Sequence, residues 1–214
     1  DNKILMAQNE FRKTDNNYNL LADFSYVNGY KSSTTKKKKN LSHLFINFDR
    51  NLNLDNFNKS DLLLSIEKVT NDTYLKVFDA HITKSPARPG NLNNLNNHLK
   101  LILNHEKYNF ESGVETYENL QASKNSDRYQ HILPYYNFDT LLGQKYFDGS
   151  INFSSSGSNT LKNTNNLKSN IINNLTYYSQ DLISDLGIKT NFDINIKNLN
   201  SIGKKNPNYK SSPQ

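Results

Sequence analysis

The stretch from Tyr18 to Val27 constrains the fold most strongly; it reads Y-N-L-L-A-D-F-S-Y-V. Its even-numbered positions are all apolar or aromatic: Tyr18, Leu20, Ala22, Phe24 and Tyr26. The odd-numbered positions are mixed and more polar. Successive side chains of an extended strand leave opposite faces of the backbone, so a period of two predicts a β-strand with one apolar face.

Composition limits what this apolar face can meet. Only 35% of the residues are hydrophobic and the mean hydropathy is −0.81, yet the chain holds 13 Tyr and 11 Phe. A soluble domain usually contains about 45–50% apolar residues, glycine included, so a core between two layers is hard to build. The aromatic content argues against a disordered chain. A sheet that is apolar on one face and hydrated on the other fits both observations.

The same alternation recurs along the chain and predicts ten strands. They cover residues 4–12, 18–27, 41–49, 61–69 with a continuation at 74–78, 97–105, 108–116, 129–138, 145–155, 167–178 and 182–196. Tight polar turns are expected at residues 14–17, 106–107 and 179–180. Long polar loops are expected at residues 28–40, 80–96, 121–128, 156–166 and beyond 199.

Strands of this length, joined by roughly alternating short and long connections, are typical of outer-membrane barrels. About nine to eleven tilted residues cross a bilayer, where only closed hydrogen-bonded ladders are stable. We therefore predict an all-β fold: an antiparallel, up-and-down transmembrane β-barrel segment. Residues 1–214 would form one curled, open part of a single larger barrel domain. The alternative is a soluble carbohydrate-binding β-sandwich, whose strands usually have about five or six residues.

Residues that could carry catalysis do not meet at catalytic distances. Glu111 and Glu115 share a strand face but lie about 13 Å apart, beyond the roughly 5–9.5 Å of paired catalytic carboxylates. Ser42 and His43 are adjacent, so in a strand they point to opposite faces. The chain has no cysteine, no glycine-rich phosphate loop and no histidine pair at metal-ligand spacing. We predict no enzyme activity, no cofactor and no metal site.

The formal net charge of +6 comes largely from one lysine run. It consists of Lys36, Lys37, Lys38 and Lys39. No aromatic residue is interleaved with these lysines, so a solvated loop is favoured over a nucleic-acid site. We expect no nucleic-acid partner.

The polar face of the predicted strands supplies the candidate lumen-facing residues. They are Asn19, Asp23, Ser25, Lys100, Glu111, Glu115, Asp148, Asn152 and Asp193. Ion pores often carry rings of one charge, whereas this set mixes both signs. A wide hydrated lumen that passes or holds an amphiphile tolerates such a mixture, and the sequence leaves both readings open.

Four strings occur in an order that resembles a known family. They are N-E-F-R from Asn9, H-L-F-I-N-F-D-R from His43, T-N-D-T-Y-L-K-V-F from Thr70, and D-R-Y-Q-H-I-L-P-Y-Y-N-F from Asp127. In order and spacing they resemble the LptD (OstA) family of outer-membrane lipopolysaccharide-assembly proteins, in its alphaproteobacterial form. The chain would correspond to an internal stretch of that barrel. The jellyroll, the first strands and the closing strands have no counterpart here, and no gate residue is carried over.

The resemblance implies a place in the outer membrane of a Gram-negative bacterium. The family's barrel is plugged by the lipoprotein LptE and receives lipopolysaccharide over a periplasmic bridge that includes LptA. It inserts lipopolysaccharide into the outer leaflet. The implied partners are therefore lipopolysaccharide, LptE, LptA and outer-membrane lipid. The lysine run at residues 36–39 lies in a long loop, which is extracellular in such barrels, and would contact lipopolysaccharide phosphates. A porin-like diffusion channel is the alternative transport function.

Overall fold

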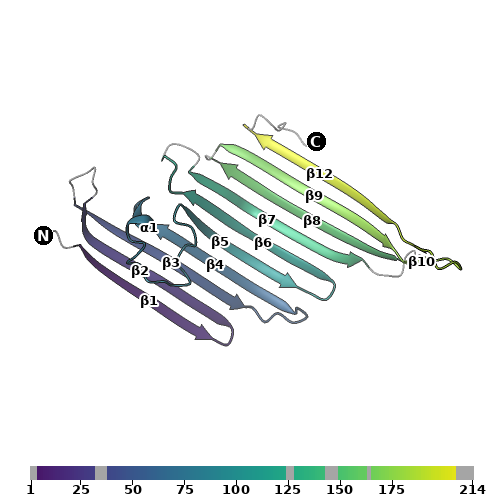
Figure 1. Cartoon of the computed structure of the whole chain (residues 1–214), viewed down its shortest axis with the longest axis horizontal. Helices are drawn as coiled ribbons and strands as arrows, with labels where there is room; N and C mark the ends of the chain where they lie inside the picture. Colours follow the sequence, from purple (N-terminus) through teal and green to yellow (C-terminus); the bar gives the residue numbers. More distant parts are fainter. Residues whose placement is uncertain (1–3, 32–37, 124–127, 143–148, 163–164, 206–214) are drawn as a thin grey trace. The chain divides into compact units, whose positions relative to one another are not determined.

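The computed structural model describes residues 4–31, 38–123, 128–142, 149–162 and 165–205. The main strands are β1 (Leu5–Asp15), β2 (Tyr18–Lys31), β3 (Lys38–Asn51), β4 (Lys59–Val69), β5 (Asn94–Asn104), β6 (Tyr108–Asn119), β7 (Tyr129–Leu142), β8 (Gly149–Lys162), β9 (Asn166–Ser179) and β12 (Asp193–Lys204). They form one ten-stranded antiparallel sheet in which strand order follows chain order (Figure 1). The predicted all-β, up-and-down arrangement is confirmed.

The chain divides into two compact units. Unit 1 comprises residues 1–52, 61–100 and 115–131, and unit 2 comprises residues 53–60, 101–114 and 132–214. Neither unit is closed or strongly curled, so the predicted curl is wrong. In a barrel, curvature follows from pairing the first strand with the last. In the described part of the chain, β1 and β12 each pair with a single neighbour, so no such closure bends the sheet.

Strand registers give unit 1 one continuous apolar face. Ala22 of β2 lies opposite Ile46 of β3, which lies opposite Ile66 of β4. Phe24 lies opposite Leu44, and these side chains are 49% and 37% exposed. Directly opposed residues of antiparallel strands share a face. The predicted apolar row of β2 therefore continues across three strands, and its middle is open to the surroundings.

The strands are longer than predicted, with 11 to 14 residues each. The predicted long loop at residues 156–166 is wrong, because the β8–β9 ladder continues until Lys162 pairs with Asn166. Serine and asparagine are poor strand formers, but here they bond to each other across the ladder. Ser155 Oγ donates to Asn173 Oδ1 at 2.8 Å, and Ser169 Oγ donates to Asn159 Oδ1 at 2.6 Å.

The predicted tight turn at residues 179–180 is also wrong, and of the tenth strand predicted at residues 182–196 only residues 193–196 lie in the sheet. Two short strands, β10 (Leu182–Ile183) and β11 (Lys189–Thr190), form a separate hairpin. Gly187 in its turn has φ +75°, a left-handed conformation that glycine adopts without steric cost. The tenth strand of the sheet is β12, which continues to Lys204 through the stretch predicted as a polar tail. The predicted alternation of short and long connections therefore fails after β8.

The connection between β4 and β5, residues 70–93, is termed the insert. Its stretch Tyr74–Phe78, predicted as strand, contains the helix α1 (Tyr74–Val77). The spacing of Tyr74, Phe78 and Ile82 fits a helical turn, and Phe78 N donates to Tyr74 O at 3.0 Å. In the described residues no helix has both the length and the apolar character needed to cross a membrane.

The insert packs on the face of β2 and β3 that was predicted to be polar. The buried apolar residues in this layer are Val27, Leu41, Phe45, Tyr74, Leu75, Phe78, Ile82, Ala87, Leu95 and Leu120. They belong to unit 1. The apolar side chain of Val27, on the otherwise polar side of β2, is thereby explained: it is fully buried in this cluster.

Candidate functional site

A cluster of polar side chains lies buried between the insert and the sheet. Ser25 of β2 is directly opposite His43 of β3, and both are at most 1% exposed. Ser25 Oγ lies 3.0 Å from His43 Nδ1. The Tyr74 hydroxyl, from α1, bonds to Ser25 Oγ and lies 3.0 Å from the same ring nitrogen. Three elements thus meet at one hydrogen-bonded point.

Asp23, two residues before Ser25 on the same face, extends the cluster and is fully buried. Gln8 Nε2 of β1 donates to both carboxylate oxygens, at 2.9 and 3.0 Å. His43 Nε2 lies 3.2 Å from Asp23 Oδ1 but without hydrogen-bond geometry. We term Gln8, Asp23, Ser25, His43 and Tyr74 the polar cluster.

The polar cluster contains the residue types of a serine–histidine–aspartate site, but it lacks access. A nucleophile must reach a substrate atom at close range, and Ser25 is fully covered. Burial raises the pKa of the Tyr74 hydroxyl, which keeps it protonated as a hydrogen-bond partner. Buried polar groups are costly unless they are hydrogen-bonded. In this conformation the cluster therefore satisfies polar groups beneath the insert, and its serine is not accessible.

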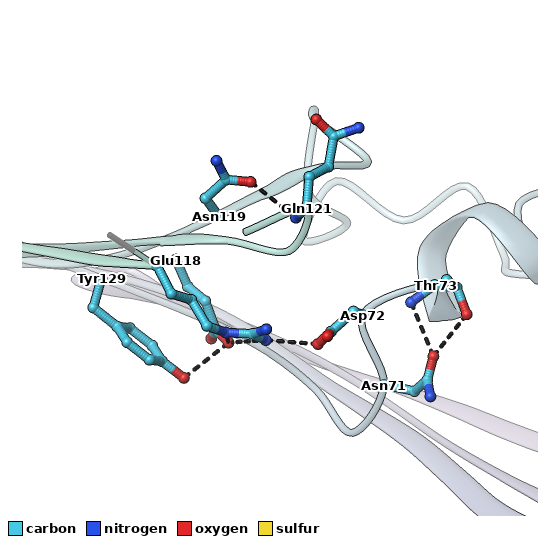
Figure 2. A network of polar contacts seen from close by, with 8 residues as sticks. Asn71, Asp72, Thr73, Glu118, Asn119, Gln121 and Tyr129 are labelled. Atoms are coloured by element: carbon cyan, nitrogen blue, oxygen red, sulfur yellow. Dashed lines mark hydrogen bonds and ion pairs between the residues drawn. The ribbon is translucent and has the colours of Figure 1, made fainter. Parts of the chain in front are cut away.

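A second network ties the insert to the sheet through Arg128, just before β7. Its Nε and Nη2 donate to Glu118 Oε1 at 2.9 and 2.6 Å, and Nη2 also donates to Asp72 of the insert at 2.6 Å. Tyr129 OH donates to the same Glu118 oxygen at 2.9 Å; Figure 2 shows Asp72, Glu118 and Tyr129 in this arrangement. The bond to Asp72, with those to Glu118, raises the pKa of Arg128.

The predicted lumen-facing residues of unit 1 fall in two places. Asn19, Asp23 and Ser25 alternate along one face of β2, where Asn19 is exposed and the other two belong to the polar cluster. Lys100 Nζ of β5 lies 2.9 Å from Glu115 Oε1 of β6, and the two form an ion pair. The structure does not bring the β2 residues and the Lys100–Glu115 pair together into one site.

The predicted residues of unit 2 are also dispersed. Glu111 accepts a hydrogen bond of 2.8 Å from Tyr135 OH, and Asn152 donates to Asp139 at 3.4 Å. Asp193 lies opposite Tyr178 at the start of β12 and is exposed. Asp148 lies outside the described residues.

Half of the predicted lysine run can be placed. Lys38 and Lys39 begin β3, where they pair with Lys31 and Tyr30 of β2. All three lysines are exposed. Lys36 and Lys37 lie outside the described residues. The end of the β2–β3 pair is therefore basic, with the third cation contributed by a lysine that the sequence analysis did not select.

Unit 1 also contains an open polar cavity of about 630 Å³, termed the amide hollow. It is lined by Glu67, Gly90, Asn91, Asn94, Asn96, Tyr117, Asn119, Arg128 and Gln130. No local sequence pattern predicts this cavity, because its lining residues come from five separate segments of an asparagine-rich chain.

Within the described residues, no group of three or more His, Asp or Glu side chains lies close enough together to hold a metal ion.

Comparison with known proteins does not assign the chain to a family. No protein-family model matches the chain. No curated protein matches it either.

Proposed function

We propose that this chain is part of the wall of an outer-membrane β-barrel that delivers lipopolysaccharide to the outer leaflet. The observation that carries the proposal is the contrast between the two faces of β2 and β3. Their apolar face is uncovered, with Phe24 49% and Leu44 37% exposed, whereas their polar face is covered by the insert. A soluble protein would bury the apolar face instead.

Exposed apolar side chains recur on strands of both units. Beyond β2 and β3 they include Phe11, Leu99, Leu133, Ile171, Leu175, Ile194 and Ile196. Contiguous apolar patches of this kind mark contact with a membrane or another protein. Strands of 11 to 14 residues are long enough for the roughly nine to eleven residues needed to cross a bilayer at a tilt. Lipid is therefore the occupant proposed for this face.

The lipopolysaccharide assignment rests on the four strings that resemble the LptD family. The exposed lysines at the end of the β2–β3 pair, Lys31, Lys38 and Lys39, suit this cargo because ammonium groups bind phosphate. The insert would lie on the lumen side and occupy part of the lumen. An insert inside the lumen also favours the second candidate function, a diffusion channel that is narrowed by a folded segment.

Single-cysteine labelling tests the membrane wall, because the chain contains no cysteine of its own. We expect a spin label at Phe24→Cys, in the whole protein reconstituted in bilayers, to be reached by oxygen and shielded from a water-soluble nickel reagent. A label at Asn19→Cys, on the opposite face of the same strand, should show the reverse preference. Equal access of the nickel reagent to both positions would contradict a lipid-facing wall.

Two further measurements separate cargo transport from diffusion. Depleting the whole protein from cells should trap newly made lipopolysaccharide before the outer leaflet. Steady open conductance of the purified protein in planar bilayers, together with normal lipopolysaccharide delivery after depletion, would favour the channel. Replacing Lys36, Lys37, Lys38 and Lys39 with serine should weaken lipopolysaccharide crosslinking at this loop. Unchanged crosslinking would refute the phosphate contact.

A further inference from the structure

The amide hollow is used neither by the polar cluster nor by the membrane wall. Five of its nine lining residues are side-chain amides: Asn91, Asn94, Asn96, Asn119 and Gln130. Each amide presents an acceptor oxygen and an NH₂ donor side by side. Its volume of about 630 Å³ lies within the roughly 300–1,000 Å³ typical of small-molecule sites.

Two of these amides are held in place through their oxygen atoms. Asn91 Oδ1 accepts from the backbone N–H of Asn93 at 2.8 Å, and Asn119 Oδ1 accepts from that of Gln121 at 2.9 Å. Figure 2 shows the Asn119 contact. Both NH₂ groups are thereby oriented and keep their donor capacity.

Other lining groups lack partners. Among the described residues, Asn96 Oδ1 is buried without a hydrogen-bond partner, and so is Arg128 Nη1. An unpaired buried acceptor is destabilising unless a ligand or water satisfies it. The hollow thus offers oriented NH₂ donors and an unpaired acceptor. A ligand whose groups both donate and accept hydrogen bonds would match it.

The charges of the hollow disfavour ions. Its cation, Arg128, is already balanced by Glu118 and Asp72, so a phosphate would meet the carboxylate of Glu67 without a free counter-charge. Glu67 Oε2 itself accepts a hydrogen bond of 2.6 Å from Asn96 N. A calcium ion needs about six to eight oxygen ligands at close range, which a cavity this wide with one lining carboxylate does not supply.

We propose that the amide hollow binds a neutral sugar unit. Sugar hydroxyls donate and accept at the same atom, which matches the amides. The hydroxyl of Tyr117 is held by Glu115, and its ring is left to pack against the C–H face of a sugar. Arg128 holds the wall of the hollow through Nε and Nη2, and its buried Nη1, which has no partner among the described residues, can donate to a sugar hydroxyl. This proposal does not rest on the lipopolysaccharide function.

Saturation-transfer NMR on the whole detergent-folded protein tests the proposal, with glucose, galactose, mannose and a heptose as separate probes. We expect at least one sugar to receive saturation, and inorganic phosphate and calcium chloride to leave its signal unchanged. Asn94→Leu and Gln130→Leu should each weaken binding about three- to tenfold, from the loss of one net hydrogen bond. Asn137→Leu, in a smaller cavity of unit 2 of about 310 Å³, is the matched control and should bind normally.

The sugar assignment fails if no probe receives saturation, or if phosphate or calcium displaces the sugar. It also fails if Asn137→Leu weakens binding as much as Asn94→Leu does. Circular dichroism of each variant separates a lost site from a lost fold. Because Asn94 is exposed at the start of β5, its replacement is expected to leave the sheet intact.

Discussion

Two antiparallel strand pairs, β2–β3 in unit 1 and β8–β9 in unit 2, share the same alternating pattern but differ in their polar faces. On β2–β3 the insert covers the polar face, and Asp23 and Ser25 are fully buried. On β8–β9 most polar residues are only partly buried and bond to neighbours on the ladder; Thr176, which is buried, accepts a hydrogen bond from Asn195 of the adjoining strand β12. The difference shows that polarity of a strand face does not determine whether that face is solvated.

The largest expected effect is on the packing between the insert and the sheet. Phe45 is fully buried and stacks on His43 with ring centroids 4.1 Å apart. Phe45→Ala should lower the free energy of unfolding by about 3–5 kcal/mol. Phe153→Ala on β8, where the ring is only partly buried, should cost about 1 kcal/mol. Urea unfolding of the whole protein in micelles, followed by circular dichroism, measures both. Equal losses would remove the distinction between the two strand pairs.

A smaller effect is expected from one hydroxyl group. Ser25→Ala leaves His43 Nδ1 and the Tyr74 hydroxyl short of a shared partner, which should cost about 1–3 kcal/mol. Ser154→Ala, on the polar face of β8, should stay within about 0.5 kcal/mol of the parent protein. The same unfolding experiment reports both values. If Ser25→Ala is neutral, the polar cluster does not hold the insert.

The smallest effect concerns an exposed ion pair of unit 2. Lys189 Nζ lies 2.6 Å from Asp181 Oδ2, and this contact lowers the pKa of the Asp181 carboxyl. The stabilisation is present above the unfolded-state value of about 3.9 and is lost as the pH falls through the lower folded-state pKa. Carboxyl NMR of the whole protein should show Lys189→Met returning this pKa toward its ordinary value, with unfolding unchanged. An unshifted titration would mean that the pair does not form in solution.

The strands could be predicted because their signal is local. Tyr18–Val27 alternates within one strand, and β2 does begin at Tyr18. The strand ends could not be predicted, because the serines and asparagines of β8 and β9 take part in a ladder only through partners on the next strand. The insert was misread for a related reason. The stretch Tyr74–Phe78 was predicted to continue the fourth strand, but packing of Tyr74 and Leu75 on the sheet favours a helix.

The buried cluster depends on pairing between strands, which composition and spacing do not reveal. Ser42 and His43 were the obvious pair in the sequence, but they point to opposite faces. The partner of His43 is Ser25, which lies opposite it across the β2–β3 ladder. Only the observed register of β2 and β3 brings the two together, and the apolar rows do not fix that register by themselves. The Arg128 network and the amide hollow involve the insert, whose path follows from no repeating pattern.

The pairing of Ser25 with His43 also determines which alignment of β2 and β3 is correct. Sliding one strand by a single residue would expose its apolar row on the wrong face, so hydrophobicity alone rejects that error. Sliding by two residues keeps every side chain on its own face, and the apolar pattern cannot detect it. That error would place Ser25 opposite Leu41 or Phe45 and leave buried polar groups unmatched. The cluster therefore favours the observed alignment of β2 and β3 over alignments shifted by two residues, which the apolar pattern alone does not distinguish.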